Sequence, residues 1–201
     1  MSERKRQAHA TSPALAERAF SDLHFIRSAM ERSGRFTSVP GKAWVWMGLT
    51  AAVAAPLSAN LSQTGWLYTW LGAAVIAAVL GFRGLLSKAQ RDGVPLFSGP
   101  GRMFLLGLCP PLIAAGVLTG VFLSAGLYDL LAGLWLLLYG VGVTTGGAFS
   151  VPLVPMAGAC FMFLGGFAFI APVASHDALM AIGFGGVHCI FGFLVWRRHG
   201  G

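Results

Sequence analysis

One histidine lies inside a long apolar stretch of this sequence, where an imidazole could act as a ligand or handle a proton. His188 sits near the middle of Ala178–Trp196, a segment that contains no Asp, Glu, Lys or Arg. A polar, ionisable side chain is costly to place in such a segment, so it is a candidate functional group. Imidazole is also a common axial ligand of haem and a common ligand of metal ions.

Four other apolar segments place a polar or polarisable side chain at a depth similar to that of His188. Counted from the cytoplasmic ends of the segments at about 1.5 Å per helical residue, this depth is roughly 9–13 Å. The members of this polar layer are Thr50, Cys109, Tyr139, Cys160 and His188. We treat the layer as the candidate ligand site, and we expect the Tyr139 hydroxyl to be the hydrogen-bond partner of His188.

Neither haem nor a metal ion is expected at His188. A bis-histidine haem site needs a second buried histidine, but the other four lie outside the apolar segments, at His9, His24, His176 and His199. A metal site would need His188 together with Cys160 and Cys189, yet adjacent residues on a helix point about 100° apart. A neutral imidazole that is hydrogen-bonded inside the fold is the simplest interpretation, and handling of a proton or substrate is the alternative.

No catalytic set can be assembled from the sequence. The acids nearest the apolar segments are Asp129 and Asp177, in connections expected on the outer side, so a Ser-His-Asp arrangement is missing. The glycines of GFGGVHCIFG (183–192) lie within an apolar helix, whereas phosphate-binding glycines connect a strand to a helix. We therefore do not expect an enzyme.

The composition predicts an all-α membrane protein. The chain has 201 residues, of which 56% are apolar and only 10% are charged, whereas soluble domains average about 25% charged residues. Apolar runs of about 17 residues or more predict transmembrane helices. We predict six, at approximately Ala43–Ala59, Trp66–Phe82, Met103–Leu127, Leu130–Thr145, Val151–Ala171 and Ala178–Trp196.

The positive charges predict the orientation of these helices. With six spans, all 14 Lys and Arg residues fall on one side, in the N-terminal arm, the second connection and the C-terminal tail. The positive-inside rule therefore places both termini in the cytoplasm. This bias explains the net charge of +7 without nucleic-acid binding, and it favours contact with anionic lipids at the cytoplasmic face.

Residues 1–41 are expected to form a cytoplasmic arm, and residues 42–201 the transmembrane bundle. Apolar side chains in the arm recur every three or four positions, which predicts an amphipathic helix over about residues 13–34. Its apolar face could lie on the inner membrane surface or dock a partner protein. The candidate docking residues are Leu15, Leu23, Ile26 and Met30.

Small residues spaced by three or four positions predict where helices pack closely in a membrane. Gly116 and Gly120 belong to such a ladder in the third apolar segment, and Gly185 and Gly192 belong to one in the sixth. These faces could serve packing within the chain or self-association into a homo-oligomer. A short echo is also present, because FTSVP (36–40) before the first span resembles AFSVP (148–152) before the fifth.

Three stretches resemble a group of small bacterial membrane proteins of unknown function. The first is HFIRSAMERSGRFTSVPGKAWVWMG (24–48), and the others are GLWLLLYGVGVTTGGAFSV (133–151) and GFGGVHCIFG (183–192). The resemblance implies a multi-pass protein of the bacterial inner membrane with six helices. It implies no activity, substrate or catalytic residue.

The function predicted from the sequence is non-enzymatic. The leading interpretation is an accessory, scaffold or signalling protein whose arm contacts a partner or the inner leaflet. The first alternative is a small transporter for an uncharged or apolar solute, with the polar layer around His188 as its site. The second is a cofactor-bearing subunit of a redox complex. A transporter requires a cavity that reaches the polar layer, which separates it from the other two.

Overall fold

The computed structural model describes residues 20–23, 26, 36–93, 96–97 and 99–200. The chain divides into two units, Met1–Arg35 and Phe36–Gly201. In the first unit, residues 20–23 are helical and exposed.

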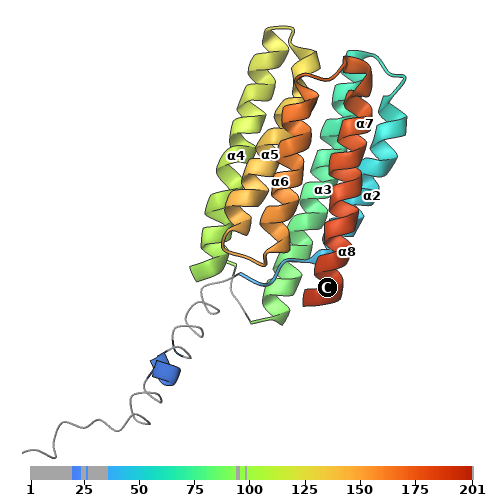
Figure 1. Ribbon diagram of the computed structural model, residues 1–201. Helices are drawn as coiled ribbons and strands as arrows, with labels where there is room; N and C mark the ends of the chain where they lie inside the picture. The colour runs from blue at the N-terminus through green and yellow to red at the C-terminus, as the bar shows by residue number, and fades with distance from the viewer. Residues whose placement is uncertain (1–19, 24–25, 27–35, 94–95, 98, 201) are drawn as a thin grey trace, which may run out of the picture. The chain divides into compact units, whose positions relative to one another are not determined.

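The second unit is built from helices (Figure 1). In chain order they are α2 (Gly41–Ser58), α3 (Gln63–Arg91), α4 (Gly99–Ser124), α5 (Leu131–Gly147), α6 (Leu153–Ala168), α7 (His176–Met180) and α8 (His188–His199). Two short 3₁₀ turns, η1 (Tyr128–Leu130) and η2 (Val173–Ser175), precede α5 and α7. The π-helical segment η3 (Ala181–Val187) joins α7 to α8 into one continuous helical stretch.

Four of these stretches are long and apolar enough to cross a membrane. They are Gln63–Arg91, Gly99–Ser124, Tyr128–Gly147 and Val173–His199. The helices α2 and α6 are not among these four stretches, and they are shorter, with 18 and 16 residues. The all-α class is therefore confirmed, and four of the six expected spans meet the requirements of length and composition.

The helices form two groups of three (Figure 1). In one group α5 packs against both α4 and α6, and in the other α2 packs against both α3 and the η3–α8 stretch. The groups meet through contacts of the α7–η3–α8 stretch with α5 and α6. Although α3 and α4 are consecutive in the sequence, they make little direct contact with each other. Residues of both α3 and α4 line a space between the two groups.

Glycines let α2 and the last helical stretch approach backbone to backbone. A Cβ atom at Gly192 would lie 2.8 Å from the Cβ of Trp44 and from the nitrogen of Val45. A Cβ atom at Gly48 would lie 2.8 Å from the carbonyl oxygen of Gly185. Gly185 and Gly192 thus lie at a close helix contact, where the small-residue ladder of the sixth segment was expected to pack.

The ladder of the third segment lies elsewhere. Gly116 and Gly120 are exposed on α4, and a Cβ atom at either would meet no atom within 4 Å. The contact between α4 and α5 instead uses Gly107, where a Cβ atom would lie 2.6 Å from the nitrogen of Gly146. The spacing of small residues predicts a packing face but does not say which small residues of α4 meet a neighbouring helix.

The two echoed segments lie side by side at one end of the bundle. The backbone N–H of Phe36 donates to the carbonyl oxygen of Phe149 at 2.6 Å, and the Ser150 hydroxyl donates to the carbonyl oxygen of Phe36 at 2.6 Å. Phe36 and Ser150 pair here in a short parallel bridge, to which the hydroxyl bond adds a further link. Each segment ends at the proline that precedes a helix, Pro40 before α2 and Pro152 before α6. The bridge thereby links the starts of two helices from different groups.

We expect Gly192→Ala to lower the stability of the bundle, because the new methyl group would press against Trp44 and Val45. Such overpacking costs about 1–3 kcal/mol. Gly186→Ala is the matched control, since a Cβ atom there would meet nothing within 4 Å. It should be neutral or stabilising. Thermal unfolding of both variants in the same detergent, followed by circular dichroism, checks the prediction, and equal melting temperatures would contradict it.

Candidate functional site

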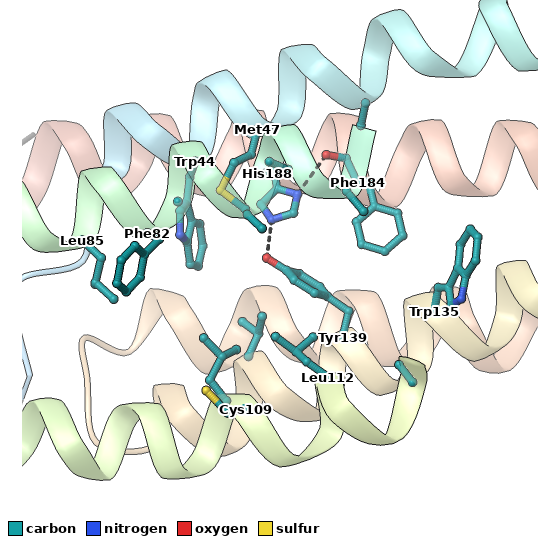
Figure 2. A pocket seen from close by; sticks show the side chains of 18 of the residues that line it. Trp44, Met47, Phe82, Leu85, Cys109, Leu112, Trp135, Tyr139, Phe184 and His188 are labelled. Carbon is teal, nitrogen blue, oxygen red and sulfur yellow. Dashed lines mark hydrogen bonds between the residues drawn. The ribbon is translucent and has the colours of Figure 1, made fainter. Parts of the chain in front are cut away.

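A cavity of about 700 Å³ lies between the two helix groups, beside His188 (Figure 2). Side chains reach it from α2, α3, α4, α5 and the last helical stretch. Its volume falls within the range of small-molecule binding sites. The lining is almost entirely aliphatic and aromatic, and among the described residues it includes no Asp, Glu, Lys or Arg. The cavity therefore suits an uncharged, largely apolar occupant.

His188 is buried at the wall of this cavity, and both of its ring nitrogens are hydrogen-bonded. Nδ1 lies 2.9 Å from the carbonyl oxygen of Phe184, and Nε2 lies 2.6 Å from the hydroxyl oxygen of Tyr139 (Figure 2). A carbonyl oxygen can only accept, so Nδ1 carries the proton, and Nε2 of the neutral ring then accepts from the Tyr139 hydroxyl. The hydrogen bond expected between Tyr139 and His188 is thus present.

Aromatic rings surround the imidazole. The ring of Phe161 lies 5.0 Å from that of His188, and the edge-on ring of Trp44 lies 5.8 Å away. Phe184 stacks on the imidazole at 6.2 Å. Such rings exclude water, so hydrogen bonds within the protein must satisfy the imidazole. His188 is held in one tautomer and one orientation as a result.

A π-helical segment precedes His188. In η3 the backbone departs from the α-helical pattern over Ala181–Val187, which ends at the residue directly before His188. Segments of this type occur frequently at functional sites. The carbonyl oxygen of Phe184, which accepts the His188 proton, belongs to this segment. The irregular backbone and the polar pair are therefore parts of one arrangement.

The structure brings together three of the five members of the polar layer. Cys109, Tyr139 and His188 all line the cavity. The Thr50 hydroxyl donates to the carbonyl oxygen of Trp46 in its own helix at 2.9 Å, and Cys160 is exposed on α6. Neither Thr50 nor Cys160 lines the cavity. The rotation of each helix about its axis turns these side chains away, and depth in the membrane does not determine that rotation.

The candidate docking face of the arm is only partly covered by the structure. Leu15 and Met30 lie outside the described residues. Leu23 and Ile26 are described, and both are exposed. The docking role of this face therefore stays a prediction.

A group of tryptophans beside the cavity was not predicted from the sequence. Trp66 Nε1 donates to the Asp177 carboxylate at 2.5 Å, and its ring stacks on that of Trp135 at 5.5 Å. Trp135 Nε1 donates to the Thr119 hydroxyl at 2.8 Å. The available signal was Trp135, which lies inside the predicted span Leu130–Thr145, whereas tryptophan usually lies at the membrane surface.

Trp70 differs from these two tryptophans. It is buried and lines the cavity, but its Nε1–H has no hydrogen-bond partner among the described residues. An unpaired buried donor costs about 1–3 kcal/mol. Native structures leave few such groups, and each calls for an explanation.

The described residues contain no group of three or more His, Cys, Asp or Glu side chains that could hold a metal ion. Comparison with models of protein families, with curated proteins and with solved structures gives no match for this chain. The geometry of the site provides a neutral hydrogen-bonded pair, Tyr139 and His188, at the wall of an apolar cavity.

We expect Tyr139 and His188 to be energetically coupled. Tyr139→Phe or His188→Leu alone leaves one buried polar group without its partner, whereas the double variant removes both. A coupling of about 0.6–1.7 kcal/mol is expected from such bonds in membrane proteins. A double-mutant cycle measured by unfolding in mixed micelles tests this value. Tyr68→Phe, at an exposed tyrosine of α3, should be additive with His188→Leu, and additivity of the Tyr139 pair would refute the coupling.

Proposed function

We propose that this chain is a six-helix membrane protein that carries an uncharged, largely apolar molecule in the cavity beside His188. The observation that carries the proposal is the cavity itself, which reaches Tyr139 and His188 and is lined by apolar side chains. This is the transport alternative of the sequence analysis. The accessory or signalling role depends on an arm face whose Leu15 and Met30 lie outside the described residues, so the proposal is built on the cavity.

The chemistry of the lining supports an uncharged cargo. An isolated charge moved into an apolar site pays a large desolvation cost unless an opposite charge meets it. The described lining residues offer no such charge. Tyr139 and His188 use their protons within the protein, so the pair presents a polar but neutral surface to an occupant.

The proposed topology has both termini on the cytoplasmic side of the bacterial inner membrane. Basic residues from distant parts of the chain gather at one end of the bundle, which supports it. The Lys88 ammonium donates to the carbonyl oxygens of His199 and Gly200 at 2.6 and 2.8 Å, and the Lys42 ammonium lies 5.2 Å from the centre of the Trp196 ring. The positive-inside rule assigns such an end to the cytoplasm.

Cysteine labelling in intact cells tests this topology. Asn60→Cys lies in the connection between α2 and α3, and Gln90→Cys lies at the opposite end of α3, and both positions are exposed. A membrane-impermeant maleimide should label the Asn60 variant from outside, and the Gln90 variant only after permeabilisation. The unsubstituted chain, with its three native cysteines, provides the background. The reverse pattern would overturn the orientation.

Native mass spectrometry of the full chain, released gently from its own membranes, tests the cargo. We expect one bound molecule per chain, of a mass compatible with a cavity of about 700 Å³. Gly116→Leu should abolish or strongly reduce this adduct, because Gly116 lines the cavity and a Cβ atom there would meet no atom within 4 Å, which leaves room for the leucine to occupy.

Gly120→Leu is the matched control for that experiment. Gly120 is exposed on the same helix, has equally open surroundings and does not line the cavity. The control variant should retain the adduct. A bare chain in every sample, or equal loss from both leucine variants, would argue against the cavity as the binding site.

A further inference from the structure

The helices around the cavity form a ring that is interrupted at one place. In this ring α3 packs against α2, α2 against the last helical stretch, that stretch against α5, and α5 against α4. By contrast, α3 and α4 make little contact with each other, although both contribute side chains to the lining. Helix packing therefore leaves the cavity unclosed along the flank between α3 and α4.

The side chains along this flank are apolar and exposed. Leu71 of α3 is 38% exposed, Phe82 of α3 is 50% exposed, and Leu112 of α4 is 38% exposed. All three also line the cavity, and Figure 2 shows Phe82 and Leu112 on the two facing helices. Because such residues reach both the cavity and the outside of the bundle, they mark an opening. In a membrane this opening would face the acyl chains.

The two ends of the cavity are covered by packed side chains. At the end where α3 begins, the buried Leu67 packs with two leucines of α5. At the opposite end, the ring of Phe36 packs 5.2 Å from that of Phe104, and both are buried. The Ser38 hydroxyl donates to the Asp92 carboxylate at 2.6 Å and fastens the segment before α2 to the end of α3. The flank is therefore a more open route than either end.

The lining extends along the helices. It runs from Trp70 to Leu85 on α3 and from Phe104 to Thr119 on α4. Each of these stretches spans about 22 Å, at about 1.5 Å per residue. The hydrocarbon core of a bilayer is about 30 Å thick. A long apolar space parallel to the helices suits a linear chain that lies in the same direction as the lipid tails.

We infer that the cargo is a linear long-chain molecule of the bilayer, which enters the cavity sideways between α3 and α4. This inference rests on the proposed function, because it names the class and the route of the occupant of the same cavity. The chain would lie along the two helices and contact side chains such as Leu71 and Leu112. A sideways opening also lets a chain enter while a polar group attached to its end stays at the membrane surface.

Photolabelling of the full chain in phosphatidylcholine vesicles tests the inference with three diazirine probes. The first is heptadecane with the diazirine at a mid-chain carbon. The second is a phosphatidylcholine with the diazirine in the middle of one acyl chain, so that its headgroup holds the probe at the membrane surface. The third is the compact adamantane diazirine. An excess of each probe without its diazirine separates saturable labelling from general contact with lipid.

The reporters are Tyr139 of α5 and Phe184 of η3, whose half-buried side chains line the cavity (Figure 2). Mass spectrometry maps the label on them, expressed per probe molecule in the membrane. Both chain probes should label the reporters saturably, the phosphatidylcholine because its acyl chain can pass between α3 and α4. The adamantane probe should label them severalfold less than heptadecane, because it cannot fill a long space.

Leu112→Trp should reduce labelling of both reporters by the chain probes severalfold, because the larger side chain would occupy the opening. Ile113→Trp is the matched control, since Ile113 is the next residue of α4, is 66% exposed and does not line the cavity. It should leave the labelling unchanged. If circular dichroism shows that Leu112→Trp does not fold, Phe82→Ala replaces it. That variant widens the opening from α3 and should increase labelling by the phosphatidylcholine probe.

The possible failures can be distinguished. If none of the three probes labels the reporters saturably, the proposed function is wrong, and the inference that rests on it is wrong with it. If heptadecane labels them but the phosphatidylcholine does not, or if Leu112→Trp and Ile113→Trp have equal effects, the cavity binds a chain but the sideways route is overturned. If adamantane labels them at least as strongly as heptadecane, the cavity binds apolar molecules but the long-chain class is overturned.

Discussion

A buried imidazole in an apolar bundle must find its hydrogen-bond partners inside the protein, and the core of this structure meets that constraint. The carbonyl oxygen of Phe184 binds one nitrogen of His188, and the Tyr139 hydroxyl binds the other. The bond between Tyr139 and His188 joins α5 of one helix group to the last helical stretch of the other. The rings of Phe161 and Trp44 pack against the imidazole of His188. The pair therefore positions the two groups around the cavity.

The cavity exists because the two helix groups meet on one side and remain apart on the other. Glycine contacts bring α2 against the last helical stretch, and α5 packs between α4 and α6. The flank between α3 and α4 lacks a comparable contact. Apolar residues on that flank can be exposed without penalty if lipid surrounds them. An aqueous surface would favour closing the same space, which links the open flank to the proposed membrane environment.

The sequence predicted most of the helical architecture and part of the site. Long, uniformly apolar runs predicted the all-α class, since the strands of a membrane barrel would alternate between apolar and polar residues over about 10 positions. Counting residues also placed Tyr139 and His188 at similar depths, which made their hydrogen bond a specific prediction. Thr50 and Cys160 have similar depths, but the rotation of their helices turns them from the cavity. Depth follows from position along a helix, whereas rotation depends on packing with neighbours.

By itself, the sequence determined that the chain is apolar, helical and basic at particular segments, because these properties follow from composition and spacing. Only the tertiary structure decided which helices are neighbours, and so which polar groups meet. The Trp66–Asp177 contact joins residues 111 positions apart, and no local sequence pattern predicts it. The same holds for the unpaired indole of Trp70 and for the separation of α3 from α4. These features arise from long-range packing, which spacing along one chain cannot specify.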